Sequence, residues 1–216
     1  LHGEPIAIKD LANAAGFETS MGSPIFKKNH VKTDDIMVAR MSAAGAIIIG
    51  KTNTPEFGLG SHTFNPVHGA TGNAYDATRS AGGSSGGAAV ALATGMIRYA
   101  DGSDMMGSLR NPAGWNNVYG MRPTWGLVPS EPLGDSFLHQ LATNGPMARC
   151  PKDLATLLSV QSGPDARQPH GLPTADFAKD MDAHGLKGAQ IAWLGDWGLP
   201  FDDGIMDISE RAVEDL

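Results

Sequence analysis

Six consecutive small residues at 82–87, Gly-Gly-Ser-Ser-Gly-Gly, constrain this chain more than any other feature of its sequence. The four glycines let the backbone approach another group closely. Small apolar residues follow, and they predict a helix over 86–94 that ends at Gly95. The run therefore lies at a helix N-terminus, where backbone N–H groups are available to a ligand or a reacting group.

Two familiar uses of such a run fit poorly. A phosphate-binding P-loop has a Lys and then a Ser or Thr after its last glycine, whereas Gly87 is followed by two alanines. A nucleophile elbow matches the pattern Gly-x-Ser-x-Gly, but it requires a buried strand directly before it, and 73–79 is not apolar. The downstream histidines that an elbow would need, His139, His170 and His184, all lie in loop-like contexts.

A second loop that contains glycine and serine is predicted over 101–108, after a short strand predicted over 96–100. The two loops flank one helix and one strand, so they can meet at one edge of a sheet. A nucleophilic serine needs a base, and no histidine is near either loop in the sequence. Lys9 directly follows the apolar strand predicted at 6–8, and a buried lysine can be neutral enough to act as that base.

With these features the sequence resembles the amidase signature family, whose members use a Ser–cis-Ser–Lys triad. The resemblance covers about residues 3–160. It is carried by the segments 3–10, 50–57, 82–87 and 103–113, with further support from 120–124 and 144–149. The spacings also fit the family, with 75 residues from Lys9 to Ser84 and 24 from Ser84 to Ser108.

The resemblance implies a role for each of these residues. Ser108 is the expected nucleophile. Ser84, which is expected to follow a cis peptide bond, relays the proton, and Lys9 is the final base. The expected oxyanion hole consists of the backbone N–H groups of Met105, Met106, Gly107 and Ser108. Candidate substrate-binding residues are Ser61, in the long polar loop 52–81, and Ser103.

Two positions depart from the family pattern. Met106 stands where the family commonly has glycine, and a methionine would be strained there if the position required a positive φ. We hypothesise that Met106 narrows or reshapes the acyl pocket, although Met105 and Met106 could also be core residues. Arg122 replaces a common lysine and is interpreted as structural, as are Asp104, Arg110 and Lys51.

The function that the resemblance implies is hydrolysis of a carboxamide to the acid and ammonia or an amine, through an acyl-enzyme. One alternative is the A-type subunit of a glutamine-dependent amidotransferase. Another is an inactive fragment or pseudoenzyme that only binds. No cofactor or metal is expected, because the histidines show no ligand spacing and Cys150 is the sole cysteine.

The predicted fold is α/β, with a mixed twisted sheet that carries helices on both faces and is expected to be incomplete. We predict one domain over 1–216, truncated at both ends. Its parts are the signature region 1–160, a surface excursion 161–188, and a segment 189–216 that holds a strand at 189–194 and the start of a helix capped by Ser209. Other predicted elements are a helix from Thr33 to Ala44 and a strand over 46–49.

The composition limits the kinds of partner that this chain is expected to bind. A net charge of −7 argues against nucleic acid, and no apolar run approaches the ~18 residues of a membrane span. The expected partner is a small amide, the expected location is the cytoplasm, and a homo-oligomer is left open.

Overall fold

The computed structural model describes residues 1–133, 140–183 and 188–216. Its contacts divide the chain into two compact units, Leu1–Met181 and Asp182–Leu216, which are described separately. In the described ranges no helix is both long enough and apolar enough to traverse a lipid bilayer.

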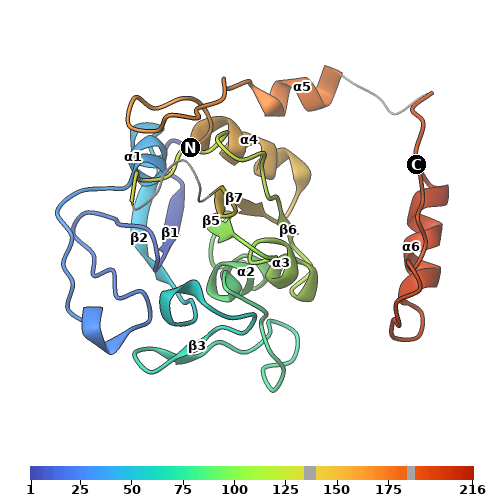
Figure 1. Ribbon diagram of the computed structural model, residues 1–216, viewed down its shortest axis with the longest axis horizontal. Coiled ribbons are helices and arrows are strands. Elements are labelled where there is room, and N and C mark those ends of the chain that lie inside the picture. Colours follow the sequence, from blue (N-terminus) through green and yellow to red (C-terminus); the bar gives the residue numbers. More distant parts are fainter. Residues whose placement is uncertain (134–139, 184–187) are drawn as a thin grey trace. The chain divides into compact units, whose positions relative to one another are not determined.

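The first unit is built on a five-stranded sheet in the order β2-β1-β5-β7-β6 (Figure 1). Strand β1 (Pro5–Lys9) pairs in parallel with both β2 (Ile47–Thr52) and β5 (Tyr99–Asp104). Strand β7 (Thr143–Ala148) runs antiparallel to β5 and to β6 (Tyr119–Gly120). The predicted mixed sheet is therefore confirmed.

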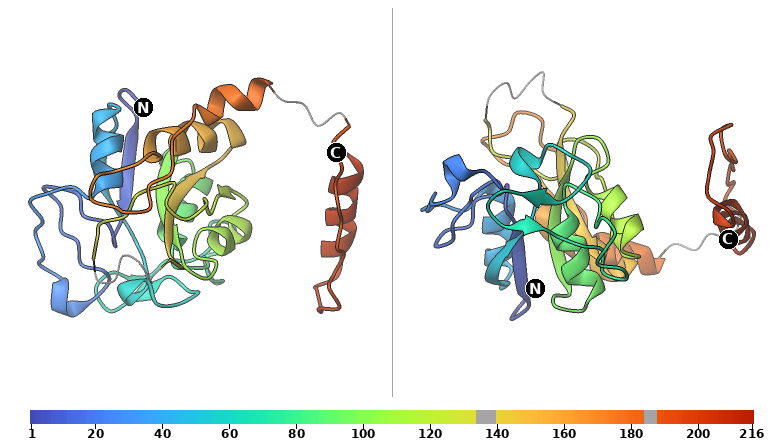
Figure 2. Two further views of the ribbon diagram at one scale, coloured as in Figure 1. Left: turned by 45° about the horizontal axis from the view of Figure 1, so that its top comes forward. Right: turned by 90° about the horizontal axis from the view of Figure 1, so that it is seen from below.

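Helices cover both faces of this sheet, as predicted (Figure 2). On one face, β1 and β5 form a core with α1 (Ile36–Ala43) and α4 (Pro151–Gln161). On the other face, α2 (Gly86–Ala93) and α3 (Arg110–Trp115) pack against β5 and β7. The remaining elements of this unit are the 3-10 turns η1 (Pro24–Phe26) and η2 (Glu56–Gly58), the hairpin β3 (Phe64–Asn65) and β4 (Gly69–Ala70), and α5 (Phe177–Ala183), whose end crosses into the second unit.

The alternation of side chains along β1 decides where its last residue points. Ile6 and Ile8 are fully buried in the core with α1 and α4, whereas Ala7 packs with α2 on the opposite face. Because successive side chains of a strand point to opposite faces, Lys9 lies on the α2 face. Strand β1 thus places Lys9 near the N-terminus of α2, next to the glycine and serine run 82–87.

Several boundaries differ from the predictions. Strand β5 spans Tyr99–Asp104, so half of the predicted loop 101–108 is strand. The physical reason is its six-residue pairing with β7, which places Gly102 opposite Gly145 and overrides the low strand propensity of glycine. Helix α1 begins at Ile36, three residues after the predicted cap at Thr33.

In the second unit the prediction of a strand at 189–194 is wrong. Those residues form no strand, and Ile191, Trp193 and Leu194 are exposed. A strand needs a neighbour to satisfy its backbone hydrogen bonds, and the described part of this unit offers none. Helix α6 (Ile205–Glu214) begins four residues before Ser209.

Candidate active site

Lys9 is the buried centre of the site. The residue is 1% exposed, and its Nζ donates to three hydroxyls: Ser84 Oγ at 2.7 Å, Ser85 Oγ at 2.8 Å and Ser103 Oγ at 3.0 Å. An ammonium has three N–H donors, so the charged form is fully bonded. A neutral amine at the same place could instead accept a proton from one of these hydroxyls.

Because Lys9 is buried, a substantial fraction of its amine is neutral near pH 7. Burial lowers the pKa of Lys9 from 10.5 to about 7, although the charges of Asp101 and Asp104 raise the pKa in opposition. Asp101 is itself buried, and its Oδ1 accepts the backbone N–H of Lys9 at 2.9 Å. Burial raises the pKa of Asp101 to about 6, against the opposing effect of that hydrogen bond.

Ser84 follows a cis peptide bond between Gly83 and Ser84, which confirms the geometry that the resemblance implies. Gly83 is needed for packing, because a Cβ there would lie 2.9 Å from the backbone N of His62 and the backbone C of Ser61. A Cβ on Gly87 would overlap the backbone N of Asn53. The glycines therefore let the segment after β2 lie directly against the serine run.

Ser108 lies in the loop between β5 and α3 and is half-buried. Its carbonyl oxygen accepts the N–H of Ser85 at 3.2 Å, which ties the two serine loops together. The structure thus joins Lys9, Ser84 and the segment that carries Ser108, residues from three separate parts of the sequence.

The buried carboxylate of Asp104 holds this loop in place. It accepts the N–H groups of Gly107 at 2.8 Å and Leu109 at 3.1 Å, and the Arg110 Nε at 3.0 Å. Burial alone would raise the pKa of Asp104, but these hydrogen bonds lower it on balance. Arg122 also reaches the carboxylate, at 3.4 Å. The interpretation of Asp104, Arg110 and Arg122 as structural residues agrees with these contacts.

The hydrogen bond from Gly107 changes the expected oxyanion hole. Because its N–H is already donated to Asp104, it is not available to a substrate oxygen. Within the part of the chain that the structure describes, the N–H groups of Met105, Met106 and Ser108 donate no hydrogen bond. Three of the four expected donors therefore have no acceptor among the described residues.

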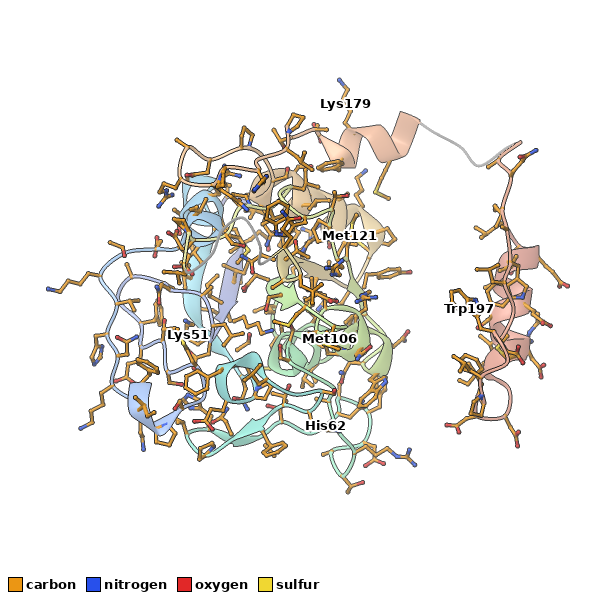
Figure 3. The ribbon with its side chains drawn as sticks, in the orientation of Figure 1. Lys51, His62, Met106, Met121, Lys179 and Trp197 are labelled. Carbon is orange, nitrogen blue, oxygen red and sulfur yellow. The ribbon has the colours of Figure 1, made fainter. Side chains whose placement is uncertain are left out.

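Met106 is not strained by its backbone. The positive φ in this loop belongs to Gly107, at +120°, where a Cβ would lie 2.7 Å from Asn111 Nδ2. Met105 and Met106 are 47% and 82% exposed, so neither is a core residue. Figure 3 shows Met106 in the loop after β5.

A cavity of about 380 Å³ lies beside these residues. Its polar lining includes Ser61, Ser84, Ser103 and Ser108, so the structure brings together all four serines that the sequence singled out. Its apolar lining comes from Leu11, Phe57, Leu59, Met105, Met106 and Ala142. Ser103 faces both this cavity and the Lys9 amine.

Sequence reasoning missed two residues of the site, Ser85 and Asp101. Ser85 Oγ lies nearly as close to the Lys9 amine as Ser84 Oγ does, at 2.8 Å against 2.7 Å, but nothing in a run of two adjacent serines distinguishes their roles. Asp101 falls in the loop predicted over 101–108. The position of Asp101 directly after the apolar residues Tyr99 and Ala100 is the sequence feature that could have indicated a buried carboxylate.

Other candidates lie elsewhere. Lys51 Nζ donates to Ala12 O at 2.6 Å and Thr19 Oγ1 at 2.9 Å, away from the cavity, in agreement with a structural role. The His170 ring packs against Trp125 at 4.7 Å, while His139 and His184 lie outside the described residues. Across 1–133, 140–183 and 188–216, no cluster of three metal-binding side chains is present.

Known proteins are similar to this chain in sequence and fold. The family described as Amidase matches residues 1–216. An acylamidase from Rhodococcus erythropolis is 38% identical over 200 residues, which cover 92% of this chain and 42% of the relative. The A-type subunit of the glutamyl-tRNA(Gln) amidotransferase from Levilactobacillus brevis is 38% identical over 222 residues, which cover 99% of this chain and 43% of the relative.

A crystal structure of a bacterial aryl acylamidase of the amidase signature family superposes with a TM-score of 0.88 at 31% identity. The match covers 99% of this chain and 45% of that protein. The chain thus spans less than half the length of the relatives it matches. Since the family match runs along the whole chain, and the fold and the order of motifs agree with it, this chain belongs to the amidase family.

Proposed function

We propose that this chain carries the catalytic centre of an amide hydrolase that works through an acyl-enzyme on Ser108. The observation that supports the proposal most is the buried Lys9 amine, 2.7 Å from Ser84 Oγ at the wall of a cavity that Ser108 also lines. A desolvated lysine with a pKa near neutrality is a suitable general base for a serine nucleophile.

In the first half-reaction Ser108 Oγ attacks the amide carbon. Its proton passes to Ser84 Oγ, and the proton of Ser84 passes to the neutral Lys9 amine. The C–N bond then breaks, and the leaving nitrogen takes a proton back through Ser84, so that ammonia or an amine departs. The N–H groups of Met105, Met106 and Ser108 are the proposed donors to the developing oxyanion, where one donor contributes about 3–4 kcal/mol in other enzymes.

In the second half-reaction water attacks the acyl carbon. Its proton passes through Ser84 to the neutral Lys9 and is returned to Ser108 Oγ as the ester bond breaks. The carboxylic acid leaves, and the site is restored without a net change in protons.

A second candidate is an amidotransferase component that releases ammonia from glutamine for transfer to an acceptor. The relative from Levilactobacillus brevis, equal in identity to the acylamidase, favours it. Both candidates use the same acyl-enzyme chemistry, and they differ in the substrate that the cavity admits.

The test is labelling of the purified protein with a fluorophosphonate, followed by intact mass and peptide mapping. We expect one adduct on Ser108 and a strong loss of labelling rate in Lys9→Met, which keeps most of the side-chain volume. Circular dichroism establishes that this variant is folded. Lys179→Ala, an exposed lysine of α5 (Figure 3), is the matched control and should label at the parent rate. An adduct elsewhere, or an unchanged rate in folded Lys9→Met, contradicts the proposal. The absence of any adduct on the parent chain contradicts it too and supports the alternative of an inactive fragment or pseudoenzyme.

A further inference from the structure

We infer that the cavity beside Ser108 takes uncharged amides with an apolar acyl group in preference to glutamine. This inference rests on the proposed function, and it names the substrate class of the same site.

The chemistry of the lining carries the inference. Six of the side chains around the cavity are apolar: Leu11, Phe57, Leu59, Met105, Met106 and Ala142. The polar ones are serine hydroxyls and the amide of Asn111. Among the described residues that line this cavity, none carries a formal charge. The volume of about 380 Å³ suits a small organic ligand.

Partners are already present for the basic side chains of the site region, Arg110, Arg122, Lys9 and Lys51. Arg110 and Arg122 both bind the Asp104 carboxylate, at 3.0 and 3.4 Å. The Lys9 amine is bonded to three serines, and Lys51 pairs with Asp10 at 3.5 Å beside a different cavity. Glutamine would bring an α-ammonium and an α-carboxylate into a site whose described lining offers no counter-charge to either, and burying unpaired charges is costly.

The apolar side chains also form an incompletely covered rim. Phe57 is 42% exposed, Leu59 73% and Met106 82%. Exposed apolar groups gathered around a concave site are typical of ligand-binding surfaces. An acyl chain lying against them removes apolar area from water on both sides. Methionine is flexible and polarisable, so Met106 can adapt to chains of different shape.

The expected effect is a dependence on chain length. Burial of one methylene corresponds to about a fourfold gain in affinity, so kcat/KM should rise roughly sixteenfold from butyramide to hexanamide. L-Glutamine should be hydrolysed at least 100-fold less efficiently than hexanamide. Ammonia release measures all three substrates in the same way.

Two variants test the role of the rim. Met106→Ser keeps the backbone N–H and removes the apolar side chain, so it should lower kcat/KM for hexanamide more than for acetamide. Met121→Ser is the control, because Met121 is also exposed, at 41%, but does not line the cavity (Figure 3). Glutamine turnover equal to or above that of hexanamide, or no rise with chain length, overturns the inference.

A binding measurement separates this inference from the proposed function. Calorimetry on Ser108→Ala compares hexanamide with L-glutamine without turnover. Tighter binding of hexanamide supports the inference even if no variant of the protein is active. Tighter binding of glutamine overturns it even if Ser108 is labelled and the hydrolase chemistry is correct.

Discussion

At the scale of single residues, the proposed chemistry depends on how the protein environment changes Lys9. Its amine lies among three hydroxyls and is excluded from water, so the charged form loses hydration that the serines replace only in part. The pKa of about 7 is the consequence. Asp101 opposes this shift, because its negative charge favours the ammonium.

The first prediction concerns the pH dependence of activity. Only neutral Lys9 can accept the proton, so kcat/KM should fall below pH 7 and be about tenfold lower at pH 6 than at pH 8. Asp101→Asn removes the charge that raises the pKa of Lys9, so this acidic limb should move to lower pH. Initial rates across pH 5–9 measure both profiles. Asp203→Asn, on an exposed carboxylate, should keep the parent profile. A limb that stays in place in Asp101→Asn would show that Asp101 does not act on Lys9.

At the scale of secondary-structure elements, close backbone packing brings the two serine loops together. The run 82–87 precedes α2, and the segment between β2 and β3 lies directly on its glycines. Asp104 at the end of β5 holds the loop before α3 through backbone N–H groups. Lys9 and Asp104 thus lie at the ends of two strands, and the two serine loops lie before two helices, while the segment between β2 and β3 completes the cavity wall.

The second prediction tests this packing through Gly87. An added Cβ overlaps the backbone of Asn53, which cannot move without disturbing the end of β2, so Gly87→Ala should lower the free energy of unfolding by about 1–3 kcal/mol. Gly114→Ala in α3 is the matched control. A Cβ there meets nothing within 4 Å, and alanine favours a helix by about 0.5–1 kcal/mol over glycine. Urea unfolding compares the two, and equal stabilities would contradict the packing argument.

At the scale of the whole molecule, the buried amine should affect the stability of the fold as well as the proposed chemistry. Lys9 has a folded pKa of about 7, below the 10.5 of an exposed lysine. Below pH 7 the folded protein bears the full cost of burying a charge. Between pH 7 and 10.5 the unfolded chain binds more protons, so the free energy of unfolding rises with pH through this window.

The third prediction follows from this linkage. From pH 7 to pH 9.5, the parent protein should gain about 3 kcal/mol in its free energy of unfolding relative to Lys9→Met, which has no titrating group at this position. Urea unfolding of both proteins at the two pH values measures the difference. Parallel pH profiles for the two proteins would mean that Lys9 keeps an ordinary pKa in the folded state.

The sequence by itself determined the features that depend on neighbouring residues. The apolar run before Lys9 and the small-residue helix that begins at Gly86 were enough to predict an α/β architecture. The mixed sheet with helices on both faces and the roles of Ser84 and Ser108 were implied by the resemblance of the motifs to the amidase signature family. The strand and the helix were predictable because apolar runs and helix signals are local properties of the chain.

Only the tertiary structure decided how long-range contacts use those residues. Pairing with β7 extended β5 through Asp104, and the strand expected at 189–194 did not form where its backbone had no neighbour. Asp104 took the N–H of Gly107, and folding brought Ser85 and Asp101 to Lys9 from 76 and 92 residues away. The burial of a side chain and its choice of hydrogen-bond partner depend on which groups from distant parts of the chain come into contact. Local sequence patterns do not contain this information.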